Sequence, residues 1–197
     1  KDTSFKPPFE KIEKVIKKGV DDKSQVNISF SGEAKYDKVD SKNLSALGEL
    51  LTIKLTEILR EEKGGVYGVG AFGGMGKLPK GSFNFSISFP CGPENVETLT
   101  KAAMDEVAKI QNGQIDDKDI SKVKEAQLVR IKESVKQNNY WSGAISGFIT
   151  QGIEINSLEE MEEQINSLNK ADIQKVAQKY LKPEQMKKFI LMPEDKK

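Results

Sequence analysis

The chain has 197 residues, and its 31 basic and 30 acidic side chains leave a formal net charge of +1. That near-balance argues against a nucleic-acid-binding protein, which needs a basic face, and no apolar run is long enough to cross a bilayer. Hydrophobic residues make up 37% and charged residues 31%, as expected of a soluble α/β or α+β domain.

The N-terminal part of the sequence predicts a lead-in and then a pair of strands. Residues 1–10 contain a double proline and read as a linker, and residues 11–197 are expected to form a single domain. Apolar and polar side chains alternate over residues 25–32, which is typical of a half-buried strand. Gly19 and the two aspartates that follow it supply turn chemistry. We therefore expect residues 11–18 and 25–32 to form a hairpin.

Residues 41–62 predict a helix, because leucine and isoleucine recur there at steps of three and four and form one apolar stripe. Gly64 and Gly65 are expected to end this helix, since glycine adopts the left-handed C-cap conformation at little cost. A strand over residues 66–72 is predicted next, and the glycines that follow it are expected to bend or bulge it.

The plainest strand pattern lies at residues 82–89, where phenylalanine and isoleucine alternate with serine and asparagine. We expect this strand to pair with the preceding one as an antiparallel ribbon, joined near residues 77–81.

Helices are predicted over most of the remaining chain, followed by a last strand. Trp141 and Phe148 lie on one of these helices and are expected in the core. The element order is not the alternation of a doubly wound sheet. The predicted fold is therefore α+β, a two-layer sandwich of a mainly antiparallel sheet with helices packed on one face. The helices are predicted at residues 93–111, after an N-cap at Asp116, around Ile145, after a capping box of Ser157 and Glu160, and from Asn169 to Pro183, and the strand at residues 186–192.

The most informative stretch for function runs from Leu59 to Tyr67, where a double glycine joins the predicted helix to the predicted strand. It presents one guanidinium, from Arg60, which can hold a carboxylate or peptide carbonyl with a fork of donors. It also presents the Tyr67 phenol, which can donate to an oxygen on which charge develops. Two structural interpretations stay open: Arg60 can complement the helix dipole, and Tyr67 can simply pack on a neighbouring strand.

Several other chemistries are disfavoured by the residues present. The chain has no histidine, which removes the usual general base, the Ser-His-Asp triad and most zinc sites. Cys91 is the sole cysteine and is interpreted as a buried structural residue. The acidic clusters do not match a calcium loop. The glycines at residues 65–70 follow a predicted helix, whereas a dinucleotide fingerprint follows a strand and opens a helix. We therefore expect no metal and no cofactor in this chain.

Four segments together resemble the C-terminal domain of the insulinase/pitrilysin-type zinc metallopeptidases. The arginine-to-tyrosine segment, with Leu59-Arg60-Glu61-Glu62 followed by Gly65-Val66-Tyr67-Gly68, is the most specific of them. The other three are residues 87–96, the Asn-Asn-Tyr-Trp sequence at 138–141, and residues 189–194. The resemblance extends over essentially the whole chain.

The resemblance implies a metal-free domain of the inverzincin type. In this family a different domain carries the His-x-x-Glu-His zinc motif, whose glutamate is the general base. The metal-free domain supplies an arginine and a tyrosine, and these match Arg60, for substrate binding, and Tyr67, for the hydrogen bond to substrate and oxyanion. The implied partners are an N-terminal catalytic domain of the same parent protein, or a partner subunit, and a peptide substrate. The isolated chain would be inactive, and zinc would lie in the missing domain.

Two other functions stay open, and the compartment is unknown. The chain could be a non-catalytic scaffold subunit of the same fold, or a peptide-binding module that uses a sheet edge. A cell-envelope or periplasmic location follows only from the family, and a cytoplasmic one is possible. No nucleic acid and no membrane span are expected.

Overall fold

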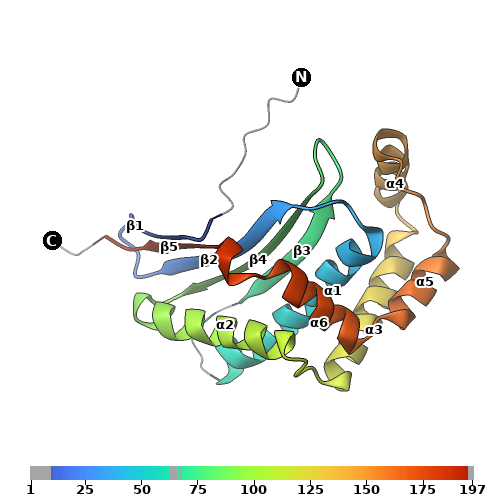
Figure 1. The fold of residues 1–197 in the computed structure, drawn as a ribbon. Coiled ribbons are helices and arrows are strands. Elements are labelled where there is room, and N and C mark those ends of the chain that lie inside the picture. Colours follow the sequence, from blue (N-terminus) through green and yellow to red (C-terminus); the bar gives the residue numbers. More distant parts are fainter. Residues whose placement is uncertain (1–9, 63–65, 67, 195–197) are drawn as a thin grey trace.

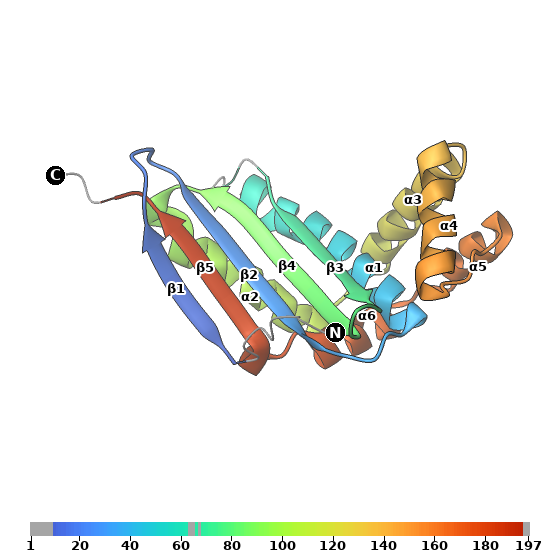
Figure 2. The same cartoon turned by 90° about the horizontal axis from the view of Figure 1, so that it is seen from above.

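The computed structural model describes residues 10–62, 66 and 68–194. Five strands form one twisted sheet, and helices cover one of its faces (Figure 1). Seen from above, the sheet lies in front and helices α1 and α2 lie behind it (Figure 2). The predicted α+β sandwich is confirmed. The lead-in expected at residues 1–10 lies outside the described residues except for Glu10.

The elements follow one another in the predicted order. The strands are β1 (Ile12–Lys17), β2 (Ser24–Glu33), β3 (Gly70–Gly76), β4 (Ser82–Cys91) and β5 (Met186–Met192). The helices are α1 (Lys38–Leu55), the π-helix η1 (Thr56–Glu62), the 3-10 turn η2 (Pro93–Asn95), α2 (Val96–Gln111), α3 (Asp117–Ser134), α4 (Asn138–Gln151), α5 (Leu158–Ser167), α6 (Lys170–Tyr180) and the 3-10 turn η3 (Pro183–Gln185).

The strands are arranged as β1-β5-β2-β4-β3, so the predicted hairpin of β1 with β2 is wrong. The last strand, β5, lies between them, antiparallel to β2 and parallel to β1. In β5, Ile190 is buried and pairs with the buried Val26 of β2, whereas all but one residue of β1 are exposed. The more apolar strand, β5, occupies the inner position because burial of its apolar surface stabilises the fold.

The predicted helix of residues 41–62 is longer at its start and changes character at its end. Asp37 caps α1, its side chain accepting hydrogen bonds from two backbone amides of the first turn. From Thr56 the helix continues as η1, whose turns are wider than α-helical ones. The apolar stripe is confirmed, since Leu44, Leu47 and Leu51 are fully buried against the sheet.

The predictions for β3 need two corrections. The strand begins at Gly70 rather than at residue 66, and its glycines do not bulge it, because pairing with β4 continues unbroken from Gly70 to Gly76. The glycines are needed in β3 because α1 approaches the strand closely. A Cβ atom on Gly73 would lie 2.6 Å from the Leu44 carbonyl oxygen, and one on Gly48 would lie 2.9 Å from the Ala71 oxygen. Glycine on both sides lets helix and strand backbones pack directly.

The helix starts are largely as predicted. Ser157 and Glu160 form the capping box of α5, and the Asn169 side chain accepts a hydrogen bond at the start of α6. Asp116 holds the N-cap position of α3, but its side chain makes no capping hydrogen bond. Its carboxylate instead lies 3.6 Å from the Lys54 ammonium.

The prediction that Trp141 and Phe148 lie in the core is wrong. On α4 their side chains are 40% and 54% exposed. Figure 1 shows α4 standing at the end of the molecule beside α3 and α5, away from the sheet. The apolar residues of α4 do follow a helical period, as predicted. A helical period does not show whether another part of the same chain covers the apolar face of the helix.

Candidate functional site

Arg60 lies on η1, where its side chain is exposed. In the part of the chain that the structure describes, no hydrogen bond or ion pair ends at its guanidinium. The neighbouring residue Leu59 is fully buried, and Val66, six residues after Arg60, is buried as well. The segment is therefore anchored in the core before and after Arg60, while the arginine itself faces solvent. Tyr67 lies outside the described residues, so its predicted position beside Arg60 stays a prediction.

The wide turns of η1 are themselves a functional signal. π-helical turns are rare, and they appear frequently at functional sites. Here the π-helix begins one residue after α1 ends and contains Arg60 in its last turn. The change of pitch alters the direction in which the last side chains of the helix leave its axis, relative to an unbroken α-helix.

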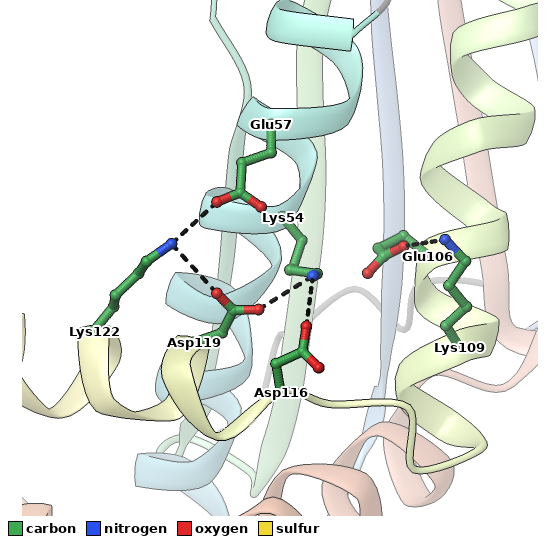
Figure 3. A network of polar contacts seen from close by, with 7 residues as sticks. All are labelled: Lys54, Glu57, Glu106, Lys109, Asp116, Asp119 and Lys122. Atoms are coloured by element: carbon green, nitrogen blue, oxygen red, sulfur yellow. Dashed lines mark hydrogen bonds and ion pairs between the residues drawn. The ribbon is translucent and has the colours of Figure 1, made fainter.

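A network of ion pairs holds η1 against α3 (Figure 3). The Lys122 ammonium lies 3.1 Å from a Glu57 oxygen and 3.4 Å from an Asp119 oxygen. The other Asp119 oxygen lies 3.1 Å from the Lys54 ammonium. The Asp119 side chain is almost completely buried. Because Glu57 belongs to η1, the network fixes the start of the segment that carries Arg60.

Each lysine of this network lies beside at least one carboxylate. Burial alone would lower the pKa of Lys54, but the hydrogen bond to Asp119 and the nearby carboxylates outweigh it and raise that pKa. The hydrogen bond to Glu57 likewise raises the pKa of Lys122. On the facing helix α2, the buried Glu106 carboxylate is paired with Lys109 at 2.9 Å. Paired lysines of this kind stay protonated at neutral pH, so the cluster is a structural clamp rather than an acid–base site.

Removing the clamp should loosen η1 selectively. In Lys122→Met, Glu57 loses its partner, and we expect amide hydrogen exchange over residues 56–62 to become about two- to fivefold faster, the usual range for an exposed ion pair. The matched control is Lys132→Met, which removes the Lys132–Glu162 ion pair on the same helix. Exchange in η1 should stay unchanged in this control. Equal effects of both variants on residues 56–62 would contradict the clamp.

The structural interpretation of the cysteine is confirmed. Cys91 is buried at the end of β4, and burial raises the pKa of its thiol, which disfavours the reactive thiolate. The glycines of β3 serve close packing against α1. Within the described ranges, no three or more Cys, Asp and Glu residues are placed to hold a metal ion together. None of the helices described is long and apolar enough to span a membrane.

On the face of the sheet turned away from the helices, the part formed by β2, β3 and β4 carries mainly small groups, whereas β5 contributes the larger Phe189 and Leu191. Serine and asparagine residues of β2 and β4 lie on this face. The residues that β3 turns to this side are Gly70, Gly74 and Gly76 and the exposed Phe72. An extended polypeptide could approach the sheet backbone closely here, since few side chains intervene.

The outer edge of β3 is less accessible. The Ala71 amide donates to the Thr52 hydroxyl at 2.9 Å, and the Met75 amide donates to the Ser41 hydroxyl at 3.3 Å. Both hydroxyls belong to α1, so the helix satisfies edge groups that an added strand would need. Strand addition by a peptide at β3 is therefore disfavoured.

Sequence reasoning proposed Arg60 as a site residue, and that role stays a prediction; the same reasoning gave no sign of the ion pairs that hold η1. Glu57, Asp119 and Lys122 are charged residues on helix surfaces, and nothing in their spacing distinguishes them from solvated ones. Only the packing of α3 against α1 and η1 brings them together.

Comparisons with known proteins agree on one family. The sequence profile described as the peptidase M16 inactive domain matches residues 1–127. The Zinc protease PQQL-like protein of Arabidopsis thaliana is 30% identical over 100 residues, which are 48% of this chain and 10% of that protein. A solved protease from Helicobacter pylori has a TM-score of 0.75 and 22% identity, and the match covers 91% of this chain and 43% of that one. The ferredoxin protease FusC, solved in complex with Arabidopsis ferredoxin, has a TM-score of 0.74 and 14% identity, over 94% of this chain and 20% of that one. The chain thus spans less than half the length of these relatives.

Proposed function

The chain belongs to the family of peptidase M16 inactive domains, and from that premise we propose that it is the metal-free, substrate-binding domain of a multidomain zinc endopeptidase. Another domain of the same polypeptide, or a partner subunit, would hold the zinc ion and supply the hydrolytic water. This chain would bind the peptide and stabilise the charge that develops on its scissile carbonyl.

The observation that carries the proposal is the state of Arg60. Its guanidinium is exposed and has no partner among the described residues, although the segment before it is clamped through Glu57 and anchored by Leu59. Holding a side chain in place while leaving its donors free is what a binding residue requires. A free guanidinium fork can grip a substrate carbonyl or a terminal carboxylate.

Tyr67 supplies the second part of the proposal. Its hydroxyl would donate a hydrogen bond to the oxyanion as the carbonyl carbon becomes tetrahedral. The chain itself contains no histidine that could serve as general base, so the base and the nucleophile would come from the zinc-carrying domain. Neither half would hydrolyse a peptide alone.

The proposed substrate is a polypeptide, and it would lie along the open face of the sheet. A complex of the structurally similar FusC with ferredoxin supports a protein as substrate. The small side chains of β2, β3 and β4 leave room for an extended chain on this face. The blocked edge of β3 disfavours the alternative of a freestanding module that binds peptides by strand addition there.

Separate expression of the two halves tests the proposal. This chain, the zinc-carrying domain, and a polypeptide that joins them would each be assayed with quenched fluorescent peptides. We expect hydrolysis only from the joined polypeptide, and zinc bound only where the zinc-carrying domain is present. Hydrolysis by this chain alone would refute the division of roles. Equal activity with and without this chain would favour the non-catalytic scaffold.

A further inference from the structure

Helix α4 exposes a surface that is unusual for a protein in which 31% of the residues are charged. From Gln137 to Ile153 the sequence contains no charged residue. The large apolar side chains of α4 lie on one side of the helix and are between 40% and 73% exposed. They are Trp141, Ile145, Phe148 and Ile149, which we name the α4 face.

The opposite side of α4 does not bury the helix well either. Gly143, Ala144 and Gly147 line that side, and a cavity of about 600 Å³ separates them from α1, α3 and α5. Within the described residues, three side-chain hydrogen bonds join the helix to the rest of the chain, and one of them comes from the Tyr140 hydroxyl, which donates to the Met161 Sδ of α5 at 3.1 Å. The Trp141 indole donates to the Val135 carbonyl oxygen, and the Lys77 ammonium donates to the Gln151 carbonyl oxygen. Ile145, Phe148 and Ile149 therefore point away from the protein. The indole nitrogen of Trp141 contacts the end of α3, although 40% of its side chain remains exposed.

An amphipathic helix typically buries its apolar side against a neighbour. We propose that the α4 face is the docking surface for a second domain of the same polypeptide, one that meets it with an uncharged, apolar surface. The proposal rests on the multidomain premise of the proposed function, but not on the roles of Arg60 and Tyr67, because it concerns a different surface.

The absence of charge indicates a permanent contact. Transient partners use charged rims that steer the encounter, whereas permanent interfaces are more apolar. Along α4 no charged side chain is available to steer a diffusing partner. A partner that is already tethered needs no steering, because the linker supplies a high effective concentration.

The size of the face argues against a second copy of this chain. A helix of 14 residues is about 21 Å long, so one side of it offers roughly 200 Å², or roughly 400 Å² summed over both partners. Stable complexes of separate chains bury about 1,200–2,000 Å². The α4 face alone is therefore too small for a free dimer, whereas a tethered domain does not have to offset the full entropic cost of bringing two separate chains together. The similar Helicobacter pylori chain, of which this chain matches 43%, is long enough to contain such a second domain.

Amide hydrogen exchange over residues 138–151 tests the docking. We compare this chain alone with a polypeptide that joins it to its neighbouring domain, and we expect at least tenfold slower exchange of α4 in the joined polypeptide. Exchange in α2, far from α4, should be the same in both. Protection that grows with the concentration of the chain alone would instead identify a second copy as the occupant. Equal exchange in both proteins would overturn the proposal.

Paired variants of the joined polypeptide sharpen the test. Ile145→Gln combined with Phe148→Gln should return the exchange of α4 to within about threefold of the value for the chain alone. The control, Val129→Gln, changes a similarly exposed apolar residue on α3 and should leave α4 protected. Trp141 is the only tryptophan, so acrylamide quenching of the chain alone checks that the face is open to solvent. Failure of peptide hydrolysis would not affect any of these readouts.

Discussion

Replacing Tyr67 by phenylalanine should lower peptide turnover by about 10²- to 10³-fold in a polypeptide that joins this chain to its zinc-carrying domain, which is the usual effect of losing one oxyanion donor. The substitution removes a single hydroxyl and keeps the ring. If the hydroxyl acts only in the transition state, kcat and kcat/KM should fall by the same factor while KM stays unchanged.

Two further variants separate the role of Tyr67 from a loss of structure. Tyr36→Phe removes a hydroxyl elsewhere in the chain and should leave turnover within twofold of the wild type. Arg60→Lys keeps the charge but loses the planar fork, so it should raise KM more than it lowers kcat. Unchanged turnover in Tyr67→Phe, with an intact fold, would remove Tyr67 from the proposed machinery.

The parts of the fold that sequence predicted best are those set by local chemistry. The helices α5 and α6 begin where Ser157 and Asn169 cap them, because a capping side chain acts on amides only two or three residues away. The strand β4 follows its alternating phenylalanine pattern, since one buried face imposes a period of two. In each case the information lies within a few residues of the element that it specifies.

The errors arose where distant parts of the chain compete. The hairpin prediction for β1 and β2 rested on good turn residues, but β5, which comes from the other end of the chain, displaces β1 from the inner position. The glycines of β3 predict a bulge, but they instead allow the close packing of α1 on the strand, which no pattern within the strand reveals. Turn chemistry and glycine content are local signals, whereas strand order and close helix packing are long-range ones.

The candidate site shows the same difference between local and long-range signals. The sequence proposes Arg60 because it lies in a distinctive segment, and that role stays a prediction. The ion pair that holds its helix joins Glu57 to Lys122, which is 65 residues further along the chain. The exposure of Trp141 could not be predicted either. An apolar helical face has the same sequence signature whether it is covered by its own domain or by another one.

The close contact between α1 and β3 predicts that Gly73→Ala will destabilise the protein by about 3 kcal/mol, the upper part of the usual range for overpacking. The added methyl group would lie 2.4 Å from a ring carbon of Phe85 and 2.6 Å from the carbonyl oxygen of Leu44. The Leu44 oxygen belongs to the backbone of α1, so the helix would have to move away from the sheet to make room.

Its neighbour Gly74 provides the matched control, because a Cβ atom there meets nothing within 4 Å. Both residues belong to β3, so both substitutions change strand propensity and the entropy of the unfolded chain in nearly the same way. Gly74→Ala should therefore be neutral or stabilise the protein by up to about 1 kcal/mol. Urea denaturation of both variants measures the difference, and equal unfolding free energies would show that α1 does not approach β3 as closely as described. Because η1 continues from α1, a displaced helix would also shift Arg60, and Gly73→Ala should then weaken peptide binding even at temperatures where the variant remains folded.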